Sequence, residues 1–263
     1  MEIVGYFMAL LIGLSLGLIG GGGSILAVPV LAYLFGLDEK LATAYSLFVV
    51  GSAAFVGGFR QYKNGHVDVR TAVVFGAPAV LGVWGVRQFV VPMLPDVLLV
   101  VEGFEFTRRM GMFGLFSVLM IWAAYSMLSP KERKSGSGAV NYNYPLILLE
   151  GLIVGALTGM VGAGGGFLII PALVMFANLQ IKRAIGTSLV IIAFKSLLGF
   201  LLSDALTAAI DWPFLLQFTG IAMLGVFAGV SVGKYIDGSK LKRGFGYFII
   251  AIACFIFTME FIV

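Results

Sequence analysis

Apolar and polar residues follow one another along this chain in long blocks, not in residue-by-residue alternation. Ten apolar segments lie at about residues 4–18, 24–36, 42–59, 71–91, 110–128, 145–160, 166–178, 184–202, 211–232 and 244–262. Because polarity does not alternate within them, these segments predict helices and not β-strands. The longest polar stretch between them, PKERKSGSGAVNYNYP at 130–145, predicts a linker between two halves.

Composition decides what surrounds these helices. Hydrophobic residues make up 60% of the 263 residues and charged residues only 11%, whereas a soluble domain carries roughly 25% charged residues. Lipid must therefore be the solvent for most of the chain. Since lipid offers no hydrogen bonds, every backbone group has to be paired internally, and we expect an all-α polytopic membrane protein. The first segment lacks a basic flank, so we expect it to be retained and not cleaved as a signal peptide.

Composition also removes several classes of function. Cys254 and His66 are the only residues of their types, so there is no material for an internal disulfide or a histidine-based metal centre. The sequence has no HExxH motif, no Walker GxxxxGK[ST] loop and no basic face for nucleic acid. We expect the protein not to be an enzyme and to use no cofactor or metal ion.

The two halves repeat each other. GLIGGGGSILAVP at 17–29 matches GMVGAGGGFLIIP at 159–171 with a constant offset of 142 residues, and the same offset pairs Lys40 with Lys182. Farther along, an offset of 143 pairs Asp68 with Asp211. Shared glycine clusters, prolines, lysines and serines indicate an internal duplication.

Each half opens with a segment that is too long for one crossing. A helix over residues 4–36 would be about 50 Å long, whereas the hydrocarbon core is about 30 Å thick. Four consecutive glycines, 20–23, interrupt it, and each costs a helix about 1 kcal/mol. We expect a helical hairpin that turns at mid-membrane, or alternatively two short, steep crossings. Residues 145–178 repeat this form.

Charge sets the orientation of the halves. Basic residues gather in the stretches 60–70, 130–145, 182–183 and 234–243, which the positive-inside rule places in the cytoplasm. The loop at 37–41 then faces outward while its repeat, 179–183, faces inward. The predicted fold is two inverted repeats, each a glycine-turn hairpin plus three transmembrane helices. We divide the chain into an N-terminal repeat (1–129), a cytoplasmic linker (130–144) and a C-terminal repeat (145–263).

The glycine turns are the main candidate for a binding site. Helices predicted to begin at Ser24 and Phe167 would present unpaired N–H groups and the positive end of the helix dipole, and glycine lets a ligand approach the backbone closely. Two such helix starts from opposite leaflets would form an anion site at the midplane. Glycines that only permit close helix packing are the alternative, which we favour for Gly57, Gly58, Gly82 and Gly85.

Lys195 lies near the middle of an apolar segment, where a charge is costly and usually functional. It suits an anionic ligand, or alternatively a structural ion pair with Glu150. The hydroxyls of Ser46, Thr187 and Ser188 could donate to ligand oxygens or bond back to their own helices. We expect Arg87 to extend to the membrane interface, and Glu150 or Glu260 could couple transport to protons. The predicted binding residues are Gly20, Gly21, Gly22, Gly23, Ser24, Ser46, Gly162, Gly164, Gly165, Gly166, Thr187, Ser188 and Lys195.

At both glycine turns the chain resembles the sulfite exporter TauE/SafE family. The residues that carry the resemblance are GLIGGGGSILAVPVL at 17–31 and GMVGAGGGFLIIPAL at 159–173, each followed by a polar loop and a helix rich in small residues. The resemblance covers nearly the whole chain. It implies an inner-membrane permease for sulfur-containing anions such as sulfite or sulfoacetate.

We therefore expect a secondary transporter, acting as an exporter, in a bacterial or archaeal cell membrane. Its expected partners are a small anion and the lipid bilayer, with a proton or sodium ion as a possible coupling ion and no nucleic acid. The alternatives are a passive anion channel with the same site, and a non-transporting membrane assembly factor. Sequence leaves the anion, the direction, the coupling ion and the oligomeric state open.

Overall fold

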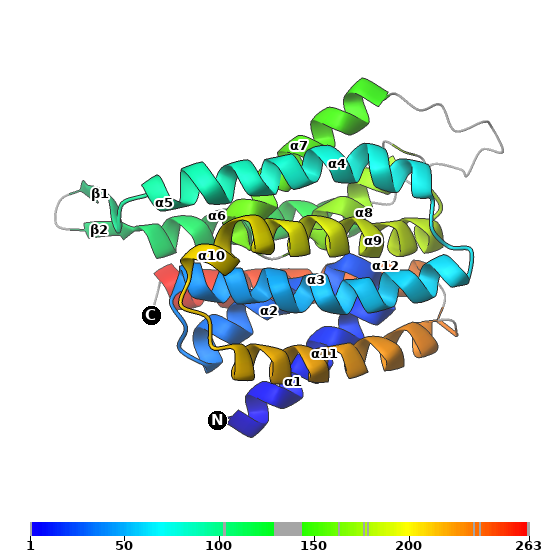
Figure 1. Cartoon of the computed structure of the whole chain (residues 1–263), viewed down its shortest axis with the longest axis horizontal. Coiled ribbons are helices and arrows are strands. Elements are labelled where there is room, and N and C mark those ends of the chain that lie inside the picture. Colours follow the sequence, from blue (N-terminus) through cyan, green and yellow to red (C-terminus); the bar gives the residue numbers. More distant parts are fainter. Residues whose placement is uncertain are drawn as a thin grey trace.

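The computed structural model is an elongated bundle of helices that run along its long axis (Figure 1). It describes residues 2–101, 104–128, 144–162, 164–175, 177, 179–233, 235–236 and 238–261. The predicted linker, 130–144, falls outside the described residues except for Tyr144.

The first half contains a hairpin, two long helices, a small pair of strands and a further helix. Its elements are α1 (Glu2–Ile19), the 3₁₀ helix η1 (Gly20–Leu26), α2 (Ala27–Pro29), the π-helical turn η2 (Val30–Leu34), α3 (Glu39–Lys63), α4 (Val69–Gly85), the π-helical turn η3 (Val86–Val90), α5 (Val91–Met93), β1 (Val97–Val101), β2 (Phe104–Thr107) and α6 (Arg108–Leu128).

The second half follows the same order without the strands. Its elements are α7 (Tyr144–Val161), α8 (Gly166–Met175), α9 (Ile181–Gly199), the π-helical turn η4 (Phe200–Asp204), α10 (Ala205–Thr207), α11 (Trp212–Gly233) and α12 (Gly238–Phe261).

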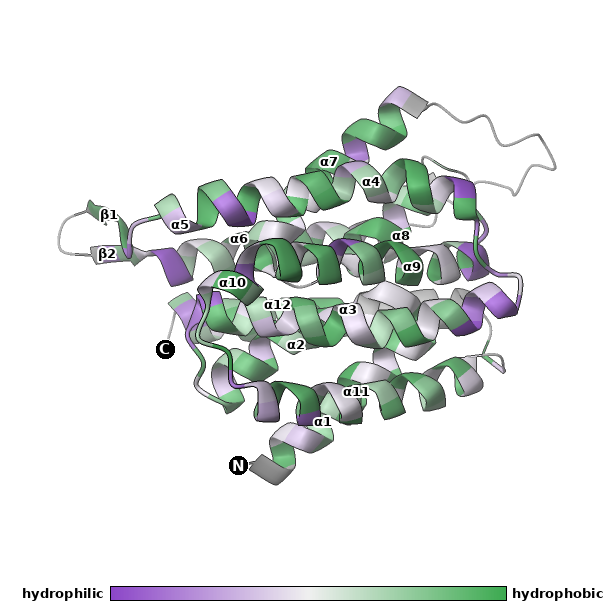
Figure 2. Ribbon diagram, viewed as in Figure 1, coloured by the Kyte–Doolittle hydropathy of each residue, from purple (hydrophilic) through white to green (hydrophobic). Residues whose placement is uncertain are grey.

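The prediction of an all-α polytopic membrane protein is confirmed. Four helical stretches in the described part of the chain are long and apolar enough to cross a membrane: Glu39–Lys63, Val69–Met93, Ile181–Thr207 and Trp212–Gly233. Figure 2 shows apolar residues along the middle of the helices and polar residues toward the two ends of the bundle. The antiparallel pair β1–β2 was not predicted, and it lies at one end of the bundle, outside the spans.

Both glycine clusters reverse the chain. A side chain at Gly23 would collide with the backbone of Leu16, and one at Gly5 would collide with the Phe35 ring, so the second arm of the first hairpin returns along α1. In the same way, Gly165 lies against Thr158 of α7. The hairpin interpretation of each opening segment therefore describes the path of the chain.

Equivalent helices of the two halves run in opposite directions. Figure 1 shows α1 entering the bundle from the end where both termini lie, and α7 entering from the other end. Helices α3 and α9 lie side by side with opposite directions. Helices α4 and α11 also run in opposite directions, on opposite sides of the bundle. The two inverted repeats would give such opposite directions, and they stay a prediction, as does the orientation of the bundle in the membrane.

Close glycine contacts join each hairpin to the opposite half. Helix α1 packs on α11, and the equivalent helix α7 packs on α4. A Cβ atom on Gly225 would come 2.2 Å from the Leu10 carbonyl oxygen, and one on its repeat partner Gly82 would come 2.5 Å from the Leu152 carbonyl oxygen. Backbone approach of this kind is how helices associate in lipid, where no hydrophobic force drives them together. The packing interpretation holds for Gly82, whereas Gly85 has open space beside it.

Ion pairs close the end of the bundle that carries the strands. Arg108, at the start of α6, binds Glu39 at 2.6 Å and Asp96 at 2.6 Å. Arg109 binds Glu260 of α12 at 3.0 Å. These pairs neutralise the two arginines that stand on the predicted outer side.

The glycine contacts predict a clear difference between two substitutions in α11. Gly225→Ala places a methyl group against the α1 backbone, so we expect it to destabilise the protein by about 1–3 kcal/mol. Gly220→Ala meets nothing within 4 Å and gains helix propensity, so it should stabilise by up to about 1 kcal/mol. Thermal unfolding in detergent checks both. Equal losses in the two variants would contradict this packing.

Candidate functional site

The two glycine turns touch each other inside the bundle. A Cβ atom on Gly21 would lie 2.3 Å from the Gly166 Cα atom, and one on Gly166 would lie 2.0 Å from the Gly21 Cα atom. Beside this contact, a Cβ atom on Gly164 would lie 3.2 Å from that of Ser24. Only residues without side chains allow the two reversals to come together this closely.

The two turns differ in backbone conformation. In the second turn Gly162, Gly164 and Gly165 have φ angles of +72°, +64° and +63°, and α8 begins directly after them. In the first turn Gly20 alone has a positive φ, +68°, and the chain continues from it as the 3₁₀ helix η1. The predicted helix start at Ser24 is therefore wrong: Ser24 lies within η1, and the second turn alone leads straight into a regular helix.

One face of a long helix covers each turn. On α3, Thr43 and Val50 contact Gly162 and Gly164, and Ser46 lies between them on the same helix. On α9, the repeat-related residues Ile185 and Ile192 contact Gly20 and Gly21, and Ser188 lies between them. Each predicted serine thus belongs to the helix that covers a glycine turn.

The predicted hydroxyl groups have different partners. Ser188 donates to the Ile185 carbonyl at 2.8 Å and accepts from the Gly21 amide at 3.4 Å. Ser24 donates to the Gly21 carbonyl at 2.7 Å, whereas the buried Ser46 hydroxyl has no partner among the described residues. Thr187 accepts from the Asp68 amide at 2.9 Å, so its hydroxyl positions the start of α4.

Lys195 is buried at the second turn. Its side chain has no exposure, and its ammonium donates to the Thr158 hydroxyl at 2.6 Å. The ammonium also lies 3.0 Å from where a Cβ atom on Gly165 would stand, immediately before the first residue of α8. A cation is thereby held beside the positive end of a helix dipole, where negative charge would be favoured.

No carboxylate neutralises Lys195 within the part of the chain that the structure describes. The ion pairs found there involve Arg87, Arg108 and Arg109. Glu150, the alternative partner that the sequence suggested, has both carboxylate oxygens buried without a hydrogen-bond partner among the described residues. The structural ion pair between Lys195 and Glu150 is therefore absent.

Arg87 is also buried, and the expectation that it extends to the membrane interface is wrong. Its guanidinium binds the Asp204 carboxylate, with an Nη2–Oδ1 distance of 2.8 Å, and also donates to the Gly159 carbonyl at 3.0 Å and to Thr43 at 3.3 Å. These contacts join η3, η4, α3 and α7 next to the second turn, where Thr43 also contacts Gly162.

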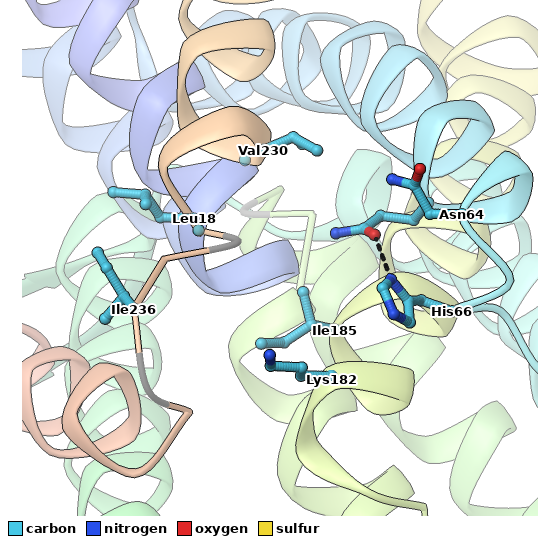
Figure 3. Close-up of a pocket in the computed structure, with 10 residues that line it drawn as sticks. Leu18, Asn64, His66, Lys182, Ile185, Val230 and Ile236 are labelled. Carbon is cyan, nitrogen blue, oxygen red and sulfur yellow. Dashed lines mark hydrogen bonds between the residues drawn. The ribbon is translucent and has the colours of Figure 1, made fainter.

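A pocket of about 340 Å³ lies at the end of the bundle opposite the strands. Figure 3 shows Leu18, Val230 and Ile236 on one side of it, Asn64 and His66 on the other, and Lys182 and Ile185 between them. The pocket is lined by Gly17, Leu18, Gln61, Asn64, His66, Lys182, Ile185, Val230, Gly233 and Ile236.

The residues that line this pocket favour a negatively charged ligand. The described residues that line it include one lysine, two amides and a histidine but no carboxylate. One residue that lines it, Ile185, also contacts Gly20 of the first glycine turn. The pocket therefore lies next to the first turn, with the Ile185 side chain between them.

Comparison with known proteins identifies the family of this chain. A family model described as "Sulfite exporter TauE/SafE" matches residues 6–256. The chain belongs to this family. A "Probable membrane transporter protein" of Xylella fastidiosa (strain 9a5c) is 30% identical over 94% of this chain and 91% of its own length. "Probable membrane transporter protein YdhB" of Bacillus subtilis (strain 168) is 24% identical over 88% of this chain and 90% of its own. No solved structure matches the chain significantly.

This TauE/SafE member is a multi-pass membrane transporter. The description of the family and the names of the relatives indicate a membrane transporter rather than an enzyme. One stretch, Gly229-Val-Ser-Val-Gly233, does spell the GxSxG pattern of serine hydrolases. It lies within helix α11, and the Ser231 hydroxyl donates to the Phe227 carbonyl of the preceding turn. The strand-to-helix turn that exposes such a nucleophile is not formed here.

Sequence analysis missed Thr158, Thr43 and the Arg87–Asp204 pair. Thr158 lies in the part of α7 after Glu150, which is otherwise apolar, and its repeat counterpart is Leu16. A hydroxyl that appears in one half only was the available signal. Arg87 and Asp204 lie at the same predicted side of the membrane, but only the packed bundle brings them together.

The contact between Lys195 and Thr158 predicts a measurable coupling. Thr158→Val removes the hydroxyl that accepts a hydrogen bond from the buried Lys195 ammonium, so it should destabilise the protein by about 1–3 kcal/mol. In a Lys195→Met background the same change should cost less, by about 1 kcal/mol. Thermal or denaturant unfolding of the four proteins gives the coupling energy.

Thr219→Val is the matched control, because the buried Thr219 hydroxyl donates only to the Leu215 carbonyl of its own helix. It should show no coupling to Lys195→Met. Strict additivity of Thr158→Val with Lys195→Met would contradict the contact.

Proposed function

We propose that this chain is a secondary transporter that exports a small sulfur-containing anion such as sulfite or sulfoacetate. The anion binds near the membrane midplane, where the two glycine turns meet. The family description names sulfite export, and the geometry at Lys195 supports an anionic substrate. The absence of a Walker motif from the sequence supports a mechanism driven by a gradient.

The position of Lys195 carries the proposal. A charge taken out of water costs several kcal/mol unless a partner of opposite sign accompanies it. Arg87, Arg108 and Arg109 each have a carboxylate, whereas the described partner of Lys195 is a neutral hydroxyl. An anionic substrate would supply the negative charge that pairs with the Lys195 ammonium.

The backbone around Lys195 fits the same substrate. The amides of Gly166 and Phe167, the first two residues of α8, lack acceptors within the helix, and they follow Gly165, which lies against the lysine ammonium. A sulfite or sulfonate group has oxygens for both the ammonium and these amides. Ser46, whose hydroxyl has no described partner, and Ser188 are placed to contact the substrate from α3 and α9.

The pocket supports export. If the basic loops lie in the cytoplasm, as the positive-inside rule predicts, the pocket opens to the cytoplasm and gives an anion a route to Gly20. Lys182, which lines the pocket, would attract that anion. Because Thr187 bonds to the Asp68 amide, we leave it out of the binding group.

Flux into proteoliposomes tests the proposal. Lys195→Met should reduce sulfite or sulfoacetate flux by at least about tenfold, because removing one partner of a buried charged hydrogen bond costs about 2 kcal/mol or more. Lys63→Met removes an equal charge from the exposed end of α3 and should leave flux nearly unchanged. Unchanged flux in Lys195→Met would remove the lysine from the site.

A thermal-shift screen identifies the anion and separates the alternatives. Sulfite, thiosulfate, sulfoacetate, taurine and simple carboxylates should be compared in wild type and in Lys195→Met. Stabilisation by sulfur oxyanions in wild type only is the expected result, and no stabilisation by any anion would favour an assembly factor. Accumulation against a gradient under an imposed proton or sodium gradient distinguishes a transporter from a passive channel.

A further inference from the structure

The Arg87 cluster and the pocket occupy equivalent places in the two halves. The offset between the halves is 142 residues as far as Gly57 and Gly199, which contact Val226 and Val83, themselves a repeat pair. Turn η4 then adds one residue as a π-helical turn, after which the offset is 143. By this correspondence Arg87 pairs with Val230.

The partners of Arg87 correspond to pocket residues as well. Asp204 pairs with Gln61, and Gln61 lines the pocket with Val230. Thr43 pairs with Ile185 and Gly159 pairs with Gly17, and these two also line the pocket. Arg87 and its three hydrogen-bonding partners thus map, residue by residue, onto four residues around an open space.

We propose that the Arg87–Asp204 pair is the gate that closes one end of the transport passage, while the pocket is the same passage open at the other end. This inference rests on the proposed function. The structure is then the state that is open on the side of the basic loops. Passage of the anion to the opposite side requires Arg87 and Asp204 to separate.

Burial and geometry fit a closed gate. The Arg87 side chain is 1% exposed and that of Asp204 is 15% exposed, so the pair fills its space and shields what lies behind it. Behind it Thr43 contacts Gly162 of the second turn, just as Ile185 at the pocket contacts Gly20 of the first. Where Arg87 fills the passage at one end, the shorter Val230 leaves it open at the other.

Cysteine accessibility tests the gate without any substrate. In a Cys254→Ser background, single cysteines replace Thr43 and Ile185, and a membrane-impermeant thiol reagent is added to either face of membrane vesicles. Ile185→Cys should be labelled from the face with the basic loops, and Thr43→Cys should be protected from both faces. Equally fast labelling of Thr43→Cys with the gate intact would overturn the proposal.

Opening the gate should reverse this protection. Arg87→Gln with Asp204→Asn leaves no unpaired charge, and it should raise labelling of Thr43→Cys from the face opposite the pocket by about tenfold or more, since a buried ion pair holds the contact. Arg109→Gln, which breaks a different pair at the same end, should leave the cysteine protected. Arg87→Lys, which keeps the charge but loses the two-pronged contact, should give intermediate labelling if the double variant does not fold.

Persistent protection of Thr43→Cys in the gate variants would overturn the proposal. Because labelling requires no anion, this outcome is distinct from a failure of the anion site, which the flux of Lys195→Met reports. If the gate variants expose Thr43→Cys while Lys195→Met has normal flux, the gate is supported and Lys195 is excluded from the anion site. If Lys195→Met loses flux while Thr43→Cys stays protected in the gate variants, the anion site is supported and the gate is excluded.

Discussion

A bilayer supplies neither counterions nor hydrogen bonds, so each charge inside this bundle has to be neutralised by the chain or by a bound ligand. Arg87, Arg108 and Arg109 meet this demand with carboxylates, and Arg60 binds the Phe227 carbonyl. Among the buried basic side chains that the structure describes, Lys195 is the exception, since its ammonium donates to a hydroxyl and pairs with no carboxylate. The account of anion binding depends on this unpaired positive charge.

The glycines determine where that charge can act. Two chain reversals come into direct backbone contact at Gly21 and Gly166, which places the start of α8 beside Lys195 in the interior. The same residue type joins α1 to α11 and α7 to α4, so each hairpin is fixed to the opposite half. Close helix packing is therefore one use of glycine in this molecule, and close approach by a ligand at the turns is the second use that we propose.

Much of this could be predicted from local signals. Segment length and the glycine clusters predicted the two hairpins, and a lone lysine in an apolar segment identified Lys195. Contacts between distant residues could not be predicted in this way. Arg87 and Asp204 are 117 positions apart, and a position near the end of an apolar segment is equally compatible with extension to the interface. The 3₁₀ path after Gly20 also escaped prediction, because four glycines impose no particular backbone angles.

The most direct measurement is a structure of the protein with selenite, a heavier analogue of sulfite, located by its anomalous scattering. The account predicts selenium at the meeting point of the turns, with oxygens about 3 Å from the Lys195 ammonium and the first amides of α8. Selenium bound elsewhere while Lys195 keeps only Thr158, or a carboxylate found beside the lysine, would contradict it.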